Sequence, residues 1–141
     1  MPTFTRLDHS GRPLNEGDLL GKAWLIQVWA TWCSPCVEEL DAMPGLYEQL
    51  AELRPRLEFL SISVDEERSS SLETLSTRAL PWPSAWADDE EALMQAWGFA
   101  GVPLTLLVDE GGRIVQVWDR SPRTPAIEQA VRELLAPAEP P

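Results

Sequence analysis

Histidine, cysteine and positive charge are scarce in this chain of 141 residues. It has one histidine and two cysteines, and its 11 lysine and arginine side chains face 23 aspartate and glutamate side chains, which gives a net charge of −12. Nucleic acids and anionic lipid surfaces bind clustered cations, so neither is an expected partner. A four-ligand zinc site would need carboxylates to complete it. We therefore expect no bound metal and no cofactor.

Long apolar runs are also missing. No stretch approaches the roughly 20 apolar residues of a transmembrane helix, and residues 1–10 lack the charged and apolar regions of a signal peptide. We therefore expect no membrane insertion of this chain. Its length and its 44% hydrophobic content fit one domain with one core. We place this domain at residues 1–136 and expect a flexible, proline-rich tail at 137–141.

Apolar runs in the first half of the chain predict an α/β fold. Residues 23–29 and 57–64 have the composition of strands that are buried on both faces. An amphipathic helix is expected between them, ending at Arg54. This βαβ unit makes the two strands parallel. Two weak strands, Phe4–Leu7 and Pro13–Leu14, are expected to form an N-terminal hairpin extension.

Sequence patterns in the second half of the chain predict the remaining helices and strands. Helical and strand patterns alternate there, separated by proline, glycine and acidic residues. The expected elements are a helix at 65–80, a strand at 84–87, a helix at 88–97, two strands at 104–108 and 113–118, and a helix at 125–135. The first two form a central αβ insert, and the strand hairpin adds antiparallel pairs. The predicted fold is a mixed central sheet with helices on both faces.

The two cysteines lie three residues apart, directly after the first buried strand. They form the run Trp32-Cys-Ser-Pro-Cys36. A disulfide stabilises a fold mainly through the loop entropy that it removes from the unfolded chain, and a loop this short removes little. A CxxC beside a βαβ pattern is typical of redox proteins. The pair is therefore better explained by redox chemistry than by structural reinforcement.

Their positions predict different roles for the two thiols. The thiolate is the nucleophile in disulfide exchange, and Cys33 is expected where unpaired helix N–H groups face its sulfur. A helix terminus supplies about 0.3–1 kcal/mol, whereas lowering a thiol pKa from ~8.5 to ~6.5 requires about 2.7 kcal/mol. Direct hydrogen bonds, such as one from the Cys36 amide, are expected to supply the rest. Cys36, one turn further into the helix, is expected to be buried and to resolve the mixed disulfide.

The run Trp29-Ala-Thr-Trp-Cys-Ser-Pro-Cys36 resembles the active-site segment of thioredoxin-fold proteins. More narrowly, it resembles that of the exported TlpA-like thiol-disulfide oxidoreductases, which include ResA. Ser63-Val64-Asp65 and Gly101-Val102-Pro103 follow in the order expected of that family. The resemblance implies a thioredoxin-like fold and an enzyme that reduces protein disulfides, supplied with electrons by another redox protein. It also implies a periplasmic or otherwise exported location, with the cytoplasm as the alternative, and we expect a monomer.

The resemblance also implies roles for individual residues. Cys33 would be the attacking thiol and Cys36 the resolving thiol. Pro103 would be a cis-proline that faces the disulfide, and Val102 would pair its backbone with a bound peptide. Trp32 would flank the site. From the sequence alone, residues 101–103 predict only a turn before a strand.

Glu39 lies three residues after Cys36 and therefore on the same helix face. ResA-like proteins carry a glutamate at this spacing, which tunes their cysteines. If it is buried beside the sulfurs, its pKa would be raised and it could relay a proton; without the family, it is a solvated helix residue. Gln27 occupies the position of the buried acid of thioredoxin, and Leu104 replaces a glutamate frequent in cytochrome-maturation reductases, which argues against an apocytochrome substrate.

Two other functions fit a thioredoxin-like chain less well. Peroxiredoxin-like peroxidases place a threonine three residues before the reactive cysteine, where this chain has Ala30. A copper(I) carrier would use the two thiolates, which are soft ligands for that ion. Carriers of this fold, however, add a histidine ligand and use a wider cysteine spacing.

The copper alternative predicts stoichiometric binding of copper(I) by the reduced Cys33 and Cys36 thiols. We expect an anaerobic titration of the reduced protein with copper(I) to show no tight stoichiometric binding. A sharp endpoint at one ion per chain would support the carrier and would contradict this expectation.

Overall fold

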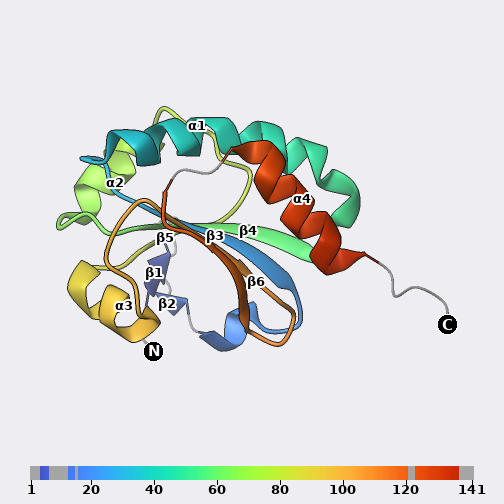
Figure 1. Cartoon of the computed structure of the whole chain (residues 1–141). Helices are drawn as coiled ribbons and strands as arrows, with labels where there is room; N and C mark the ends of the chain where they lie inside the picture. The colour runs from blue at the N-terminus through green and yellow to red at the C-terminus, as the bar shows by residue number, and fades with distance from the viewer. Residues whose placement is uncertain (1–3, 7–12, 15, 121–122, 137–141) are drawn as a thin grey trace, which may run out of the picture.

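The computed structural model describes residues 4–6, 13–14, 16–120 and 123–136, and the predicted tail at 137–141 lies outside them. These residues form a mixed sheet with helices on both of its faces (Figure 1). The strands lie in the order β2-β1-β5-β4-β3-β6-β7. This architecture confirms the predicted α/β class, the mixed sheet and the two-sided helical cover.

The centre of the sheet is the parallel pair β3 (Ala23–Trp29) and β4 (Leu57–Ser63), which pair over their full length. Helix α1 (Ser34–Gln49) and the 3₁₀ turn η2 (Ala51–Leu53) connect them. The predicted helix up to Arg54 therefore ends earlier than expected and is completed by a 3₁₀ turn. The strand β6 (Leu104–Val108) pairs antiparallel with β3 on its other side.

Side chains of β3 alternate between two apolar layers. Ala23 and Leu25 belong to the layer that contains Met43 of α1 and Ile127 of α4 (Thr124–Leu135). Trp24, Ile26 and Val28 belong to the opposite layer, together with Leu93 and Met94 of α3 (Glu90–Trp97). In Figure 1, α1 and α4 accordingly lie above the sheet and α3 lies below it. A strand buried on both faces explains the continuous apolar run that predicted it.

The N-terminal extension and the central insert are joined to the sheet through one strand. β1 (Phe4–Arg6) pairs antiparallel with β2 (Pro13–Leu14) and with β5 (Ser84–Trp86), and β5 is parallel to β4. The predicted hairpin and insert are confirmed for the described residues, while Leu7 and the turn between the two N-terminal strands lie outside them.

The helix of the insert is shorter than predicted. α2 covers Arg68–Leu75 rather than residues 65–80. The hydroxyl groups of Ser76 and Thr77 donate hydrogen bonds to the Glu73 and Thr74 carbonyls, at 2.6 and 3.3 Å. Such side-chain bonds compete with the helical pattern, and Pro81 disfavours helical backbone at the residue before it. The side-chain bonds lie at the observed end of the helix, whereas the proline acts only at Leu80.

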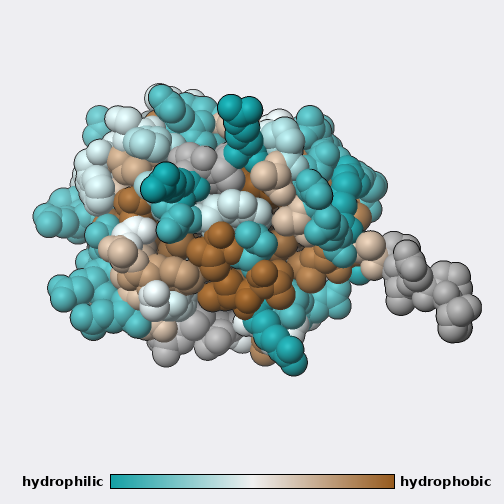
Figure 2. All heavy atoms as spheres, viewed as in Figure 1, coloured by the Kyte–Doolittle hydropathy of each residue, from teal (hydrophilic) through white to brown (hydrophobic). Residues whose placement is uncertain are grey.

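One edge of the sheet carries exposed apolar side chains. β7 (Ile114–Trp118) is the last strand, and Ile114 and Val115 are 43% and 45% exposed. Figure 2 shows the corresponding apolar area over β6 and β7. The pairing of β6 with β7 shifts register between Leu107 and Val108. A bulge of this kind interrupts the regular hydrogen-bonding pattern of an edge strand.

The start of α3 offers a simple test of the fold. Asp89 caps the helix by accepting a hydrogen bond from the Ala92 N–H at 3.0 Å. We expect Asp89→Ala to lower the free energy of unfolding by about 1 kcal/mol in urea denaturation, because the cap is lost. The neighbouring Asp88→Ala is the control and should change it by less than about 0.5 kcal/mol. Equal losses in the two variants would contradict the cap.

Candidate active site

Cys33 and Cys36 form a disulfide at the start of α1, with Cα atoms 5.2 Å apart. Cys33 is the N-cap residue of the helix, and Pro35 occupies its first turn, where proline costs no helical hydrogen bond. The Cys36 N–H donates to the Cys33 sulfur at 3.3 Å. Cys33 is 7% exposed and Cys36 is fully buried. The predicted amide contact and the greater depth of Cys36 are both present.

This geometry can serve both oxidation states of the pair. In the reduced protein the Cys33 sulfur would carry the reactive negative charge, and the Cys36 N–H already points at it. A hydrogen bond to a charged acceptor is about twice as strong as one between neutral groups. The cap therefore stabilises the thiolate more than the thiol, which is what an attacking cysteine requires.

Three residues predicted to contact the substrate lie on two segments. Trp32 is 64% exposed in the turn before Cys33, whereas Trp29 is fully buried at the end of β3. The bond between Val102 and Pro103 is cis, as the family resemblance implied. Val102 is partly buried and packs against the apolar cluster that contains both cysteines. The roles of Trp32, Val102 and Pro103 in binding a peptide stay predictions.

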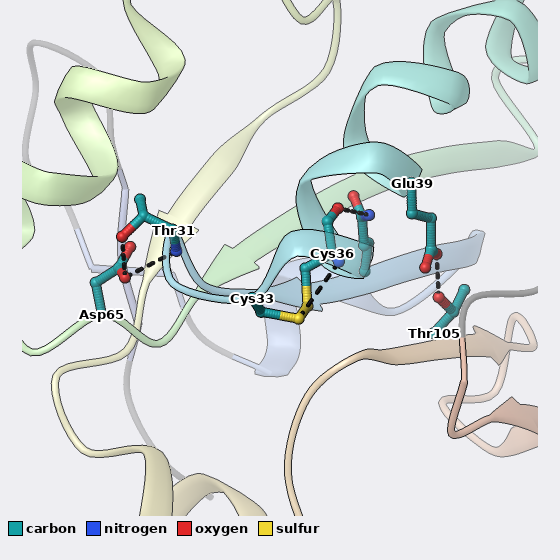
Figure 3. Close-up of a disulfide and its surroundings, with 7 residues drawn as sticks. Thr31, Cys33, Cys36, Glu39, Asp65 and Thr105 are labelled. Atoms are coloured by element: carbon teal, nitrogen blue, oxygen red, sulfur yellow. Dashed lines mark hydrogen bonds between the residues drawn. A yellow bond between two sulfur atoms is a disulfide. The ribbon is translucent and has the colours of Figure 1, made fainter.

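Glu39 is 5% exposed, so the interpretation of Glu39 as a solvated helix residue is wrong. Its carboxylate accepts a hydrogen bond from the Thr105 hydroxyl at 2.5 Å, and Figure 3 shows the two side chains directed toward each other. Thr105 is paired with Gln27 in the register of β6 and β3. Gln27 donates from Nε2 to the Cys36 carbonyl at 3.4 Å. A buried polar layer thus lies beneath the first turns of α1.

Asp65 is a second buried carboxylate near the disulfide, and it was not among the predicted site residues. It is 2% exposed and accepts hydrogen bonds from Thr31, in the turn before Cys33, and its other oxygen lies 2.9 Å from the hydroxyl groups of Ser63 and Ser71. In Figure 3, Asp65 lies on one side of the disulfide and Glu39 on the other. The sequence signals were the polar end of the apolar run 57–64, where Ser63 and Asp65 alternate with Val64, and the place of this run in the family resemblance.

An open pocket of about 410 Å³ lies next to the exposed Trp32. Asp65, Glu66, Glu67 and Glu90 line it, so its wall is acidic. Burial raises the pKa of Glu90. The pocket is adjacent to the turn that carries Cys33.

Within the described part of the chain, no three histidine, cysteine, aspartate or glutamate side chains gather as metal ligands would. Among the same residues, none of the helices has the length and apolar character needed to cross a membrane.

The sequence model of the AhpC/TSA family matches residues 1–117. The chain is similar to the thiol-disulfide oxidoreductase ResA of Bacillus anthracis, with 28% identity over 115 residues, which is 82% of this chain. The chain spans about 65% of the length of that relative.

Solved structures share the fold. The thioredoxin domain of a thiol-disulfide oxidoreductase from Bacteroides vulgatus matches with a TM-score of 0.76 and 22% identity, over 94% of this chain and 92% of that one. A candidate thiol-disulfide oxidoreductase from the same organism matches with a TM-score of 0.74 and 30% identity, over 94% and 86% of the two chains. The thioredoxin-like fold is thereby confirmed.

The contact between Thr105 and Glu39 predicts a loss of stability when the hydroxyl is removed. We expect Thr105→Val to lower the free energy of unfolding by about 1.5–3 kcal/mol, because a buried carboxylate loses a donor. Thr105→Ser keeps the hydroxyl and should lose only about 0.8 kcal/mol, the contribution of a buried methyl group. Urea denaturation of both variants, each also combined with Glu39→Ala, measures the coupling. Additive losses would contradict the hydrogen bond.

Proposed function

Because the chain belongs to the AhpC/TSA family and bridges its two cysteines at the start of α1, we propose that it is a thiol-disulfide oxidoreductase that reduces protein disulfides. The observation that carries this proposal is the hydrogen bond from the Cys36 N–H to the Cys33 sulfur. The reactive sulfur is thus held where a negative charge is stabilised, while its partner is buried behind it. The similarity to ResA and to solved thiol-disulfide oxidoreductases supports the same chemistry.

In the first step, the Cys33 thiolate attacks one sulfur of a substrate disulfide. A bond forms between Cys33 and that sulfur, the substrate S–S bond breaks, and the second substrate sulfur leaves as a thiolate that takes up a proton. The helix N-terminus and the Cys36 N–H stabilise the charge of Cys33 before the attack. The slight exposure of Cys33 limits the reaction to disulfides that can approach the turn.

In the second step, Cys36 attacks the sulfur of Cys33 in the mixed disulfide. The Cys33–Cys36 bond forms, and the first substrate sulfur leaves as a thiol after protonation. Two electrons have then passed from the cysteine pair to the substrate. A dithiol of an electron-donor redox protein restores the pair by the reverse exchange.

We further propose that Glu39 takes the proton of the Cys36 thiol. A thiol must lose its proton before it can attack, and Gln27 cannot act as a base. Glu39 is a buried carboxylate one helical turn from Cys36, held by Thr105. A positioned carboxylate of this kind can act as a general base.

The substrate is proposed to approach over Trp32 and the segment at Val102 and Pro103. Trp32 offers an exposed aromatic surface beside the disulfide, and a backbone that is not fully paired can add hydrogen bonds to an extended peptide. We also propose that the protein is a monomer and acts outside the cytoplasm, as the exported TlpA-like proteins do.

The two cysteines predict opposite outcomes when each is replaced. With dithiothreitol as the reductant, we expect Cys33→Ser to abolish the acceleration of insulin reduction over dithiothreitol alone in a turbidity assay. Cys36→Ser should instead accumulate a covalent mixed disulfide with the substrate, because the resolving thiol is absent. This adduct is detected by mass spectrometry after the reduced variant is mixed with insulin in the absence of dithiothreitol. Acceleration of insulin reduction by Cys33→Ser equal to that of the unchanged protein would refute the proposed function.

A further inference from the structure

Asp65 follows the carboxyl end of β4, at the edge of the sheet where β3 also ends. Its side chain is 2% exposed, and no lysine or arginine among the described residues forms an ion pair with it. A buried carboxylate without a cation is costly unless hydrogen-bond donors surround it. The hydrogen-bond donors around Asp65 therefore identify the parts of the fold that its side chain connects.

The two oxygens of the carboxylate contact different parts of the fold. Oδ1 accepts from the Thr31 N–H at 2.9 Å and from the Thr31 hydroxyl at 2.8 Å. Oδ2 lies 2.9 Å from the hydroxyl groups of Ser63 on β4 and Ser71 on α2. These two hydroxyl groups are also hydrogen-bonded to each other. Because each hydroxyl has one proton, one of the two donates to the other and the second donates to the carboxylate. Asp65 thus connects the turn at Thr31 to a strand and a helix.

The turn held by Oδ1 is the one that presents the reactive sulfur. It runs from Ala30 to Cys33, and its backbone is closed by a hydrogen bond from the Cys33 N–H to the Ala30 carbonyl at 3.1 Å. Trp32, at its tip, is 64% exposed and therefore gains little support from packing. Figure 3 shows Thr31 directed toward Asp65, away from the disulfide.

We propose that Asp65 is a positioning residue for thiol-disulfide exchange, which fixes through Thr31 the turn that presents Trp32 and Cys33 to the substrate. This inference rests on the proposed function. Exchange requires the attacking sulfur in line with the substrate S–S bond, and a misplacement of about 1 Å in a reacting group can cost about 100-fold in rate. A turn held by two hydrogen bonds to one buried anchor keeps that alignment without touching the substrate.

The test compares variants that loosen the turn with variants that leave it bonded. Asp65→Asn replaces one carboxylate oxygen by a donor, and Thr31→Val removes the hydroxyl but keeps the side-chain shape. Thr31→Ser restores the hydroxyl, and Ser71→Ala removes a bond of Oδ2 on the α2 side only. The rate constant of the reduced protein with insulin is measured in a single turnover by tryptophan fluorescence. Urea denaturation gives the stability of each variant.

We expect Thr31→Val and Asp65→Asn to slow exchange about tenfold, while Thr31→Ser and Ser71→Ala stay within about twofold of the unchanged protein. Ser71→Ala should nevertheless lose stability, because it also breaks a buried hydrogen bond. Equal slowing by Ser71→Ala, or a rate for Thr31→Val within twofold, would overturn the inference and leave Asp65 a purely structural residue. If Asp65→Asn does not fold, the exchange rates of Thr31→Val and Thr31→Ser are sufficient to test the inference.

Failure of the proposed function can be distinguished from failure of this inference. A protein that does not reduce insulin at all would refute the proposed activity. The same variants are then compared by the rate of exchange with oxidised glutathione, a small disulfide whose reaction also requires the Cys33 sulfur in line with its S–S bond. The predicted ranking, with Thr31→Val slow and Thr31→Ser fast, applies to that reaction as well, and a flat ranking overturns the inference.

Discussion

The parallel pairing of β3 with β4 is the constraint on which the site depends. The two strands pair residue by residue from Ala23 with Leu57 to Trp29 with Ser63, so their carboxyl ends coincide at one edge of the sheet. The chain leaves β3 into the turn of Cys33 and leaves β4 through Val64 into Asp65. A shift of one residue would turn each strand's side chains to the opposite face and separate these groups. The register of these seven mostly apolar residue pairs therefore determines that the turn of Cys33 and the polar side chain of Asp65 lie close together.

Two buried carboxylates flank the disulfide within an otherwise apolar core. Glu39 is bonded to Thr105 on the antiparallel side of β3, and Asp65 is bonded to Thr31 on the parallel side. Burying such groups costs stability unless each finds donors. Around Asp65 the fold meets that cost with hydroxyl groups and the Thr31 N–H, and no described lysine or arginine forms an ion pair with it. Glu39 is thereby placed for the proposed proton transfer, and Asp65 for the proposed anchoring of the turn.

Local patterns explain which parts were predictable. The apolar runs of β3 and β4, the cysteine spacing and the acidic start of α3 are each encoded within a few neighbouring residues, and all were found in the sequence. The burial of Glu39 was not, because a position on a helix face does not reveal that Thr105, 66 residues away, lies opposite it. Asp65 was missed as a site residue for the same reason, since its bond to Thr31 spans 34 residues. The early end of α2 depended on side-chain bonds that propensity does not capture.

The Cys33 sulfur is both a redox centre and the cap of α1. Forming or breaking the disulfide therefore changes the group that terminates a 16-residue helix. In a closed thermodynamic cycle, the difference in folding free energy between the oxidised and reduced proteins equals the difference in redox free energy between the folded and unfolded chains. An interaction that stabilises the start of α1 more in one oxidation state than in the other therefore shifts the reduction potential of the cysteine pair. The change in folding stability on oxidation and the shift in reducing power on folding are, in this sense, two measurements of one quantity.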